Sequence, residues 1–120
     1  MTRFTLFSVL ALLLLLPATA QQIPVDLQLQ QKIVVAMEEM SAVHMGMTRR
    51  DLQRVFQELG GVSSPYRRTY SYRRCHFIQV VVDFKPVAPP DAQGRVLVAS
   101  DEDVITSISK PYIALHVVTD

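Results

Sequence analysis

The chain has 120 residues, of which 49% are hydrophobic and 19% are charged, with one cysteine and a formal net charge of +1 at pH 7. This length predicts a single domain, and one cysteine excludes an intramolecular disulfide. The nearly balanced charge excludes a strongly basic or strongly acidic protein.

The first 20 residues have the pattern of a secretory signal peptide. Arg3 supplies a positive charge, residues 6–16 form an apolar run, and Ala18-Thr19-Ala20 is a small-residue cleavage motif. The run is shorter than the roughly 20 residues that span a bilayer; an uncleaved anchor is the alternative. We expect residues 1–20 to be removed and residues 21–120 to form one periplasmic or secreted domain without a transmembrane span. In that mature chain eleven basic side chains balance eleven acidic ones.

A first helix is predicted to begin near Val25 or Asp26. The Asp26 carboxylate in the first turn favours the positive end of the helix dipole. Apolar residues then recur at steps of three and four, which is typical of one face of an amphipathic helix. The predicted buried face consists of Leu29, Ile33, Ala36 or Met37, Met40 and Val43.

A second helix is predicted from Thr48 to Gly60-Gly61. Thr48 is a good N-cap, and Asp51 three residues later completes a capping pattern. The glycines end the helix because glycine adopts the left-handed conformation at little cost. The predicted buried face is Leu52, Val55, Phe56 and Leu59, and the predicted outer side carries Arg49, Arg50 and Arg54.

After a connector at residues 62–65 the apolar period changes to two, which indicates strands. Tyr70 and Tyr72 alternate with polar residues, and a second alternating run covers residues 77–84. Arg73 to His76 is predicted to be a hairpin tip, with one long bent strand as the alternative. One face of the sheet is predicted to carry Arg73, Phe77, Gln79 and Val81, partly open to solvent or to a partner.

The rest of the chain is predicted to complete the sheet. Residues 86–94, with three prolines and a glycine, form a loop, and residues 96–99 add a short extended piece. Val104 to Ser109 is the third strand, and residues 113–118 are a fourth strand or an extended tail. The expected fold is α+β, with two N-terminal helices packed on one face of a three- to four-stranded antiparallel sheet.

Several segments together resemble a known family. The stretches "HMGMTRRDLQRVFQELGG", "TYSYRR", "FIQVVVDF" and "DVITSISK" resemble the SmpA/OmlA-type (BamE-like) exported bacterial domains, and the related β-lactamase-inhibitor-protein-like fold. The resemblance covers roughly residues 44–110. The lipid-bearing cysteine of those domains is absent, and Gly60-Gly61 replaces their Gly-x-Pro. The resemblance implies a non-enzymatic binding or scaffolding role at the cell envelope.

The segment from Tyr66 to Arg74 is the predicted partner-binding strand. It interleaves aromatic residues with arginines, which are common anchors of protein interfaces and suit anionic groups. The predicted contacts are Tyr66, Arg67, Arg68, Arg73 and Arg74, and the predicted partner is a cell-envelope protein or an anionic envelope component. Export argues against a nucleic acid. The alternative is a strand whose tyrosines pack on the core and whose arginines lie in water.

The methionine-rich run 37–47 has two interpretations. On one helix face Met37, Met40 and His44 come together, and Met45 or Met47 lies nearby, so a soft-metal carrier for Cu(I) is the alternative function. The other interpretation is a joint between two helices, in which Met40 and Met47 fill the core. We favour the joint, and therefore predict no cofactor.

Catalytic patterns are weak in this sequence, and we predict that the protein is not an enzyme. Cys75 and His76 are adjacent, so on a strand they point to opposite faces. We expect the Cys75 thiol to be buried or half-buried. The acidic loop Asp101-Glu102-Asp103 lacks the full calcium-binding pattern, and there is no phosphate-binding loop.

Overall fold

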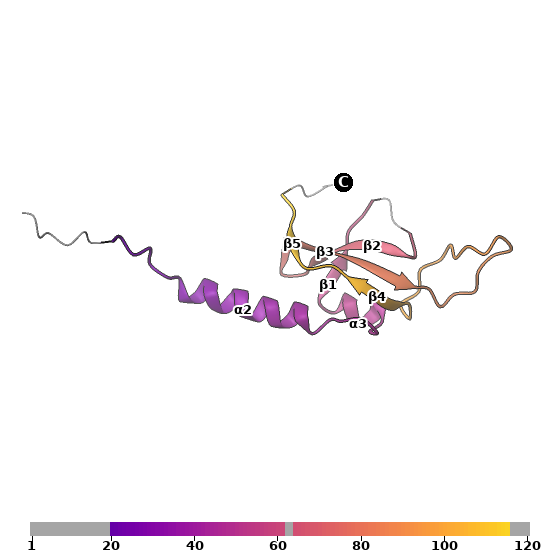
Figure 1. Ribbon diagram of the computed structural model, residues 1–120, viewed down its shortest axis with the longest axis horizontal. Coiled ribbons are helices and arrows are strands. Elements are labelled where there is room, and N and C mark those ends of the chain that lie inside the picture. Colours follow the sequence, from indigo (N-terminus) through magenta and orange to yellow (C-terminus); the bar gives the residue numbers. More distant parts are fainter. Residues whose placement is uncertain (1–19, 62–63, 116–120) are drawn as a thin grey trace, which may run out of the picture.

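The structure is a computed structural model that describes residues 20–61 and 64–115. Two helices precede the strands (Figure 1), so the predicted α+β class and element order are confirmed. The elements are α2 Leu27–Ser41, α3 Arg49–Gln53, β1 Phe56–Glu58, β2 Arg67–Tyr72, β3 Cys75–Lys85, β4 Val104–Ile108 and β5 Tyr112–Ile113. The predicted signal peptide up to residue 19 and the tail from residue 116 lie outside the described residues.

Five strands of the described chain form one antiparallel sheet, rather than the three to four expected. The order is β1-β2-β3-β4, and β5 pairs with β3 on the same edge as β4 but at different residues of β3. The longest strand, β3, is therefore central. Tyr70 pairs with Val80, and the chain turns at Arg73 and Arg74, which confirms the predicted hairpin, although Cys75 and His76 already belong to β3.

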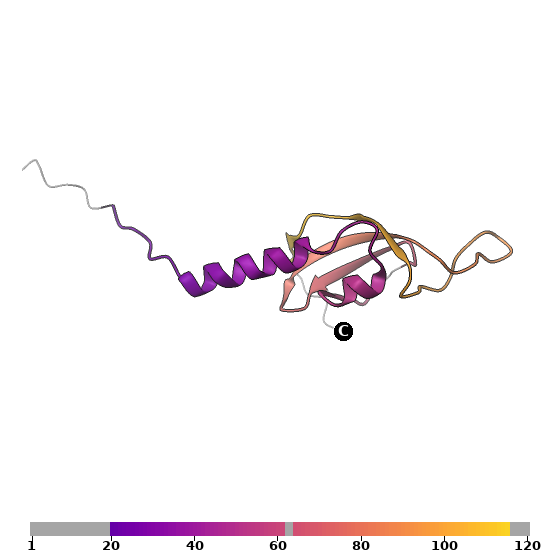
Figure 2. The same cartoon turned by 90° about the horizontal axis from the view of Figure 1, so that it is seen from below.

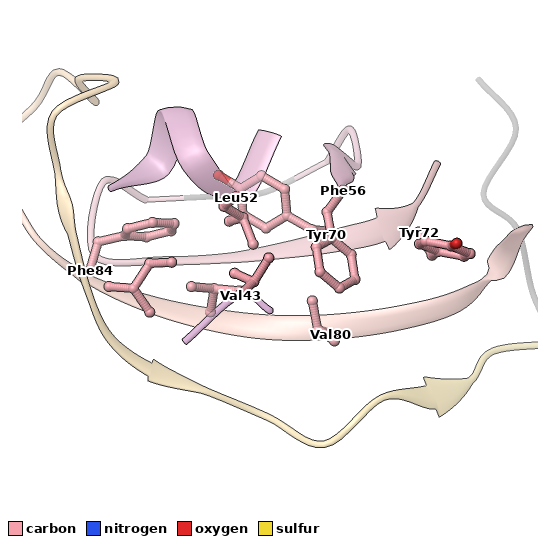
Figure 3. Close-up of a cluster of buried hydrophobic side chains, with 9 residues drawn as sticks. Val43, Leu52, Phe56, Tyr70, Tyr72, Val80 and Phe84 are labelled. Atoms are coloured by element: carbon pink, nitrogen blue, oxygen red, sulfur yellow. The ribbon is translucent and has the colours of Figure 1, made fainter. Parts of the chain in front are cut away.

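The core lies between α3 and one face of the sheet (Figure 3). Alternate residues of β2 and β3 point to this side because strand side chains have a period of two. The ring of Phe56 meets that of Tyr72 edge to face at 6.2 Å, and Tyr70 meets Phe84 in the same way at 6.1 Å. The buried hydrophobic residues are Val43, Leu52, Phe56, Tyr70, Tyr72, Val80, Val82, Phe84 and Ile105.

The second helix begins as predicted but ends earlier. The Thr48 side chain accepts a hydrogen bond from the Asp51 amide, and the Asp51 carboxylate accepts one from the Thr48 amide at 3.2 Å. The helix stops at Gln53, so the prediction of a helix to Gly60 is wrong. Phe56 to Glu58 instead form β1 and pair with β2. This pairing buries the Phe56 ring in the sheet and satisfies the backbone there.

The first helix, α2, departs further from expectation. Asp26 is its N-cap, close to the predicted start. None of the helix's fifteen residues, all of them described, is buried. The predicted buried face is wrong for Leu29, Ile33 and Met37, which are 54%, 50% and 59% exposed. Toward its C-terminal end α2 packs against the core through Ala36 and Met40, and its N-terminal part projects beyond the body (Figures 1 and 2).

The connection at residues 86–103 projects from the opposite end of the body (Figure 1). It contains no strand, so the loop at 86–94 is confirmed and the extended piece at 96–99 is wrong. At its tip the Asp91 carboxylate accepts hydrogen bonds from the amides of Gln93 and Arg95. Gly94 there has a φ of +77°, a conformation that favours glycine. The tip is therefore an ordered turn.

Candidate functional site

The arginines of the predicted binding strand lie at the two ends of β2. Arg67 and Arg68 begin the strand, and Arg73 and Arg74 form the turn that follows it. At roughly 3.4 Å per residue, Arg67 and Arg73 are about 20 Å apart along the chain. The structure therefore divides the four predicted arginine contacts into two pairs.

The first pair is engaged within the protein. The Arg67 guanidinium donates two hydrogen bonds to the Asp83 carboxylate, at 2.6 and 3.0 Å. The Arg67 hydrogen bond holds the pKa of Asp83 below its usual value. Arg68 forms an ion pair with Glu58. An incoming anion must therefore compete with two carboxylates, although much of the Arg67 side chain remains in water.

The second pair is also engaged. Arg73 donates to the Gln53 carbonyl oxygen at 2.7 Å, and Arg74 lies 3.0 Å from the Glu39 carboxylate of α2. Tyr66, the predicted stacking residue, is exposed. The four arginines thus tie β2 to its neighbours, and all of them except Arg68 keep exposed side chains.

The outer face of the sheet is less open than predicted. Arg73 and Phe77 are exposed, but Gln79 is buried, so that part of the prediction is wrong. The Tyr112 hydroxyl donates to the Gln79 side-chain oxygen at 3.4 Å. Val81 is half-buried. The pairing of β5 with β3, which the sequence did not predict in this register, brings Tyr112 to Gln79.

The most highly connected polar residue is Arg49, which sequence analysis placed on the outer side of a helix. It is 2% exposed, so that prediction is wrong. Its guanidinium carbon lies 3.8 Å from the centre of the Phe84 ring, within cation–π range. It donates to the Tyr70 hydroxyl at 2.7 Å and to the Asp103 carboxylate at 2.9 Å. Helical spacing does not distinguish an arginine in water from one that meets a buried carboxylate.

Asp103, predicted to lie in an acidic loop, is the buried partner of Arg49. Its carboxylate also accepts hydrogen bonds from the amides of Val87 and Ser100, both at 3.0 Å. Burial raises the pKa of Asp103, but the hydrogen bonds from these amides and from Arg49 outweigh it, and the pKa lies below its usual value. One carboxylate therefore holds both ends of the 86–103 connection.

A groove of about 780 Å³ lies between α2 and the β2–β3 hairpin. Its charged lining residues are Lys32 and Arg74. At one end the Tyr72 hydroxyl donates to the Glu39 carboxylate at 2.6 Å; burial and this bond raise the pKa of Tyr72. The apolar walls are Leu29, Ile33, Val35 and Ala36 of α2, and Tyr72, Cys75 and Ile78 of the hairpin. Cys75 is half-buried there, as expected.

The methionine-rich run does not form one helical face. The helix ends at Ser41, before His44, whose ring Nδ1 lies 2.9 Å from the Met45 carbonyl oxygen. Met40 and Met47 pack against the core, as predicted for a joint. Met37, His44 and Met45 are exposed. Within residues 20–61 and 64–115, no group of three or more histidine, cysteine or acidic side chains is placed to hold a metal ion.

Comparison of the chain with protein families, with curated proteins and with solved structures finds no match. In the described part of the chain, no helix has the length and apolar character needed to cross a bilayer. The groove and the exposed side chains of α2 are therefore the basis for inferring what this protein can bind. An apolar groove beside a projecting apolar helix can bind another apolar surface.

Proposed function

We propose that this protein is a periplasmic or secreted, non-enzymatic binding or scaffolding domain for a cell-envelope component. The observation that carries the proposal is α2, an entire helix without a buried residue. Contiguous exposed apolar surface on a soluble domain is typical of an interaction site. We assign the binding surface to the groove and to the apolar side chains of α2 that border it.

The resemblance to SmpA/OmlA-type domains supports the same role. Two helices followed by an antiparallel sheet are consistent with such a fold. The exported location follows from the signal-peptide pattern of residues 1–20, and the scaffolding role follows from the resemblance. The absence of a lipidation cysteine sets this chain apart from those domains.

The arginine strand is a secondary contact in this proposal. The side chains of Tyr66, Arg67 and Arg74 are exposed. The ion pairs of Arg67 with Asp83 and of Arg74 with Glu39 hold the two guanidinium groups in place. An anionic envelope component that reaches Arg67 or Arg74 replaces the Asp83 or Glu39 carboxylate with its own anionic group. We therefore expect charge to tune the affinity of a complex that the apolar groove forms.

Site-specific photo-crosslinking in the exporting cell tests this function. A photoreactive residue at Ile33 reports on the groove, and one at Leu97, an exposed apolar position in the 86–103 connection, is the control. The proposal predicts a discrete crosslinked envelope protein from position 33 and none from position 97. Failure of position 33 to form any adduct, under conditions where the protein is exported, contradicts it.

A further inference from the structure

The exposed apolar surface of α2 continues around the helix and into the segment before it. Ile33 faces the groove, and Val34 lies about 100° further round the helix. Seven large apolar side chains between residues 23 and 37 are 48–89% exposed. They are Ile23, Val25, Leu27, Leu29, Ile33, Val34 and Met37.

This helix has little to stabilise it alone. An isolated helix of about 12–15 residues is marginal in water. Inside α2, which is fully described, there is no ion pair between residues three or four apart. Its polar ties to the body are the contacts of Glu39 with Tyr72 and Arg74, both near its C-terminal end. The N-terminal half therefore gains most from a partner.

The composition of the segment defines that partner. Between residues 21 and 37 the charged side chains are Asp26 and Lys32 alone. Helices that lie on anionic lipid carry a polar face rich in lysine and arginine, which this segment lacks. The partner surface must therefore be apolar and nearly neutral, as α2 itself is.

The area available fits a pair of such helices. Full burial of one aliphatic side chain removes about 60–120 Å² from water, at ~25 cal/mol per Å². Seven side chains at the observed exposures then offer roughly 400 Å² per copy. A standard interface buries about 800 Å² per partner, slightly more than half of it apolar. The apolar requirement of a dimer is thus nearly met by this surface.

We infer that α2 of a second copy occupies the groove. The two helices lie antiparallel, and the N-terminal half of each fills the groove between α2 and the β2–β3 hairpin of the other. Since the body lies at the C-terminal end of α2 (Figures 1 and 2), this arrangement keeps the two bodies apart. Overlap centred on Leu29 places Asp26 of one copy level with Lys32 of the other. The inference rests on the proposed function, because it names the partner of the same surface.

Sedimentation of the protein purified from the exporting cell, across a dilution series, tests the dimer. We expect twice the mass of one chain at high concentration and one chain on dilution. The double variant Leu29→Glu, Ile33→Glu places charges on exposed positions and should weaken association by at least about 100-fold. The matched control, Leu97→Glu, alters a residue that is 69% exposed in the 86–103 connection and should leave the mass unchanged.

Disulfide trapping gives a second measurement that does not depend on affinity. In a Cys75→Ala background, Leu29→Cys should form a covalent dimer on mild oxidation, and Leu97→Cys should not. A single-chain mass at every concentration, with no trapping at position 29, overturns the dimer. If position 33 nevertheless crosslinks to a different envelope protein, the proposed function stands and only the second copy is excluded. If position 33 crosslinks to nothing, both fail.

Discussion

The sheet body and the helix α2 both have regularly spaced apolar residues, with a period of two in the strands and steps of three and four in the helix, but only those of the body are buried. In the body, the apolar residues on one face of β2 and β3 pack with Leu52 of α3 and are buried. In α2, equally regular apolar residues lie at the surface. The difference is the presence of an opposing layer, since periodicity creates a face but supplies nothing to cover it. We propose that this uncovered face is a binding surface.

The largest expected difference in stability is between loss of the buried Arg49–Asp103 ion pair and loss of an exposed ion pair. Asp103→Ala leaves Arg49 buried without its carboxylate and removes the acceptor for two amides. We expect the free energy of unfolding to fall by about 3–5 kcal/mol, measured by urea denaturation. Glu102→Ala removes an exposed ion pair with Arg50 and should cost no more than ~0.5 kcal/mol. Equal effects of the two substitutions contradict the buried network.

An aliphatic deletion compares the two regions directly. Leu52→Ala empties a fully buried position and should cost about 3 kcal/mol. Ile33→Ala shortens a half-exposed side chain on α2 and should cost ~0.5 kcal/mol or less in dilute solution. Urea denaturation of both variants measures the difference. A loss at Ile33 that approaches the loss at Leu52 means that α2 is covered within a single chain.

The capping box of α3 is a smaller contribution to the body. Thr48→Ala removes the side-chain oxygen that accepts from the Asp51 amide, and the expected loss is about 1 kcal/mol. Thr106→Ala, at an exposed strand position, is the control and should have little effect. Thermal denaturation of the two variants measures this difference in stability. An unchanged melting temperature for Thr48→Ala indicates that the short helix does not depend on its cap.

Lowering the pH should reduce the stability of the fold gradually. The pKa of Asp103 lies below its ordinary value of 3.8, so its ionised form stabilises the fold fully above that pH. This stability is lost as the pH falls through the lowered pKa. Urea midpoints should therefore decline in strongly acidic solution, below the ordinary aspartate range. A midpoint that stays constant or rises there contradicts the assigned charge state of Asp103.

Local signals in the sequence identified much of the body. Alternation found β2 and β3 with their hairpin, and the Thr48–Asp51 spacing found the start of α3, because both patterns depend on neighbours in the chain. The end of α3 was missed because Phe56 belongs to a strand only once β2 lies beside it. Arg49 was misplaced for the same reason, since its carboxylate partner comes 54 residues later.

Less of the candidate site than of the fold could be predicted from the sequence. The arginine-rich strand was found by composition, but its ion pairs with Glu58 and Asp83 depend on sheet register. The groove was not predicted, because its walls come from α2 and from a hairpin more than 30 residues away. The residues of its helical wall were recognised as an apolar stripe and assigned to the core. Whether these apolar residues belong to the core or to the proposed binding surface depends on how much of α2 packs against the sheet.

Hydrogen exchange of the backbone amides tests this distinction most directly. At high dilution, we predict that amides of residues 28–34 in α2 exchange much faster than those of residues 78–84 in β3. Raising the protein concentration should slow exchange in α2 and leave β3 unchanged, because a second copy covers the helix. Strong protection of residues 28–34 at every concentration contradicts the account, since it means that the body of the same chain already covers α2.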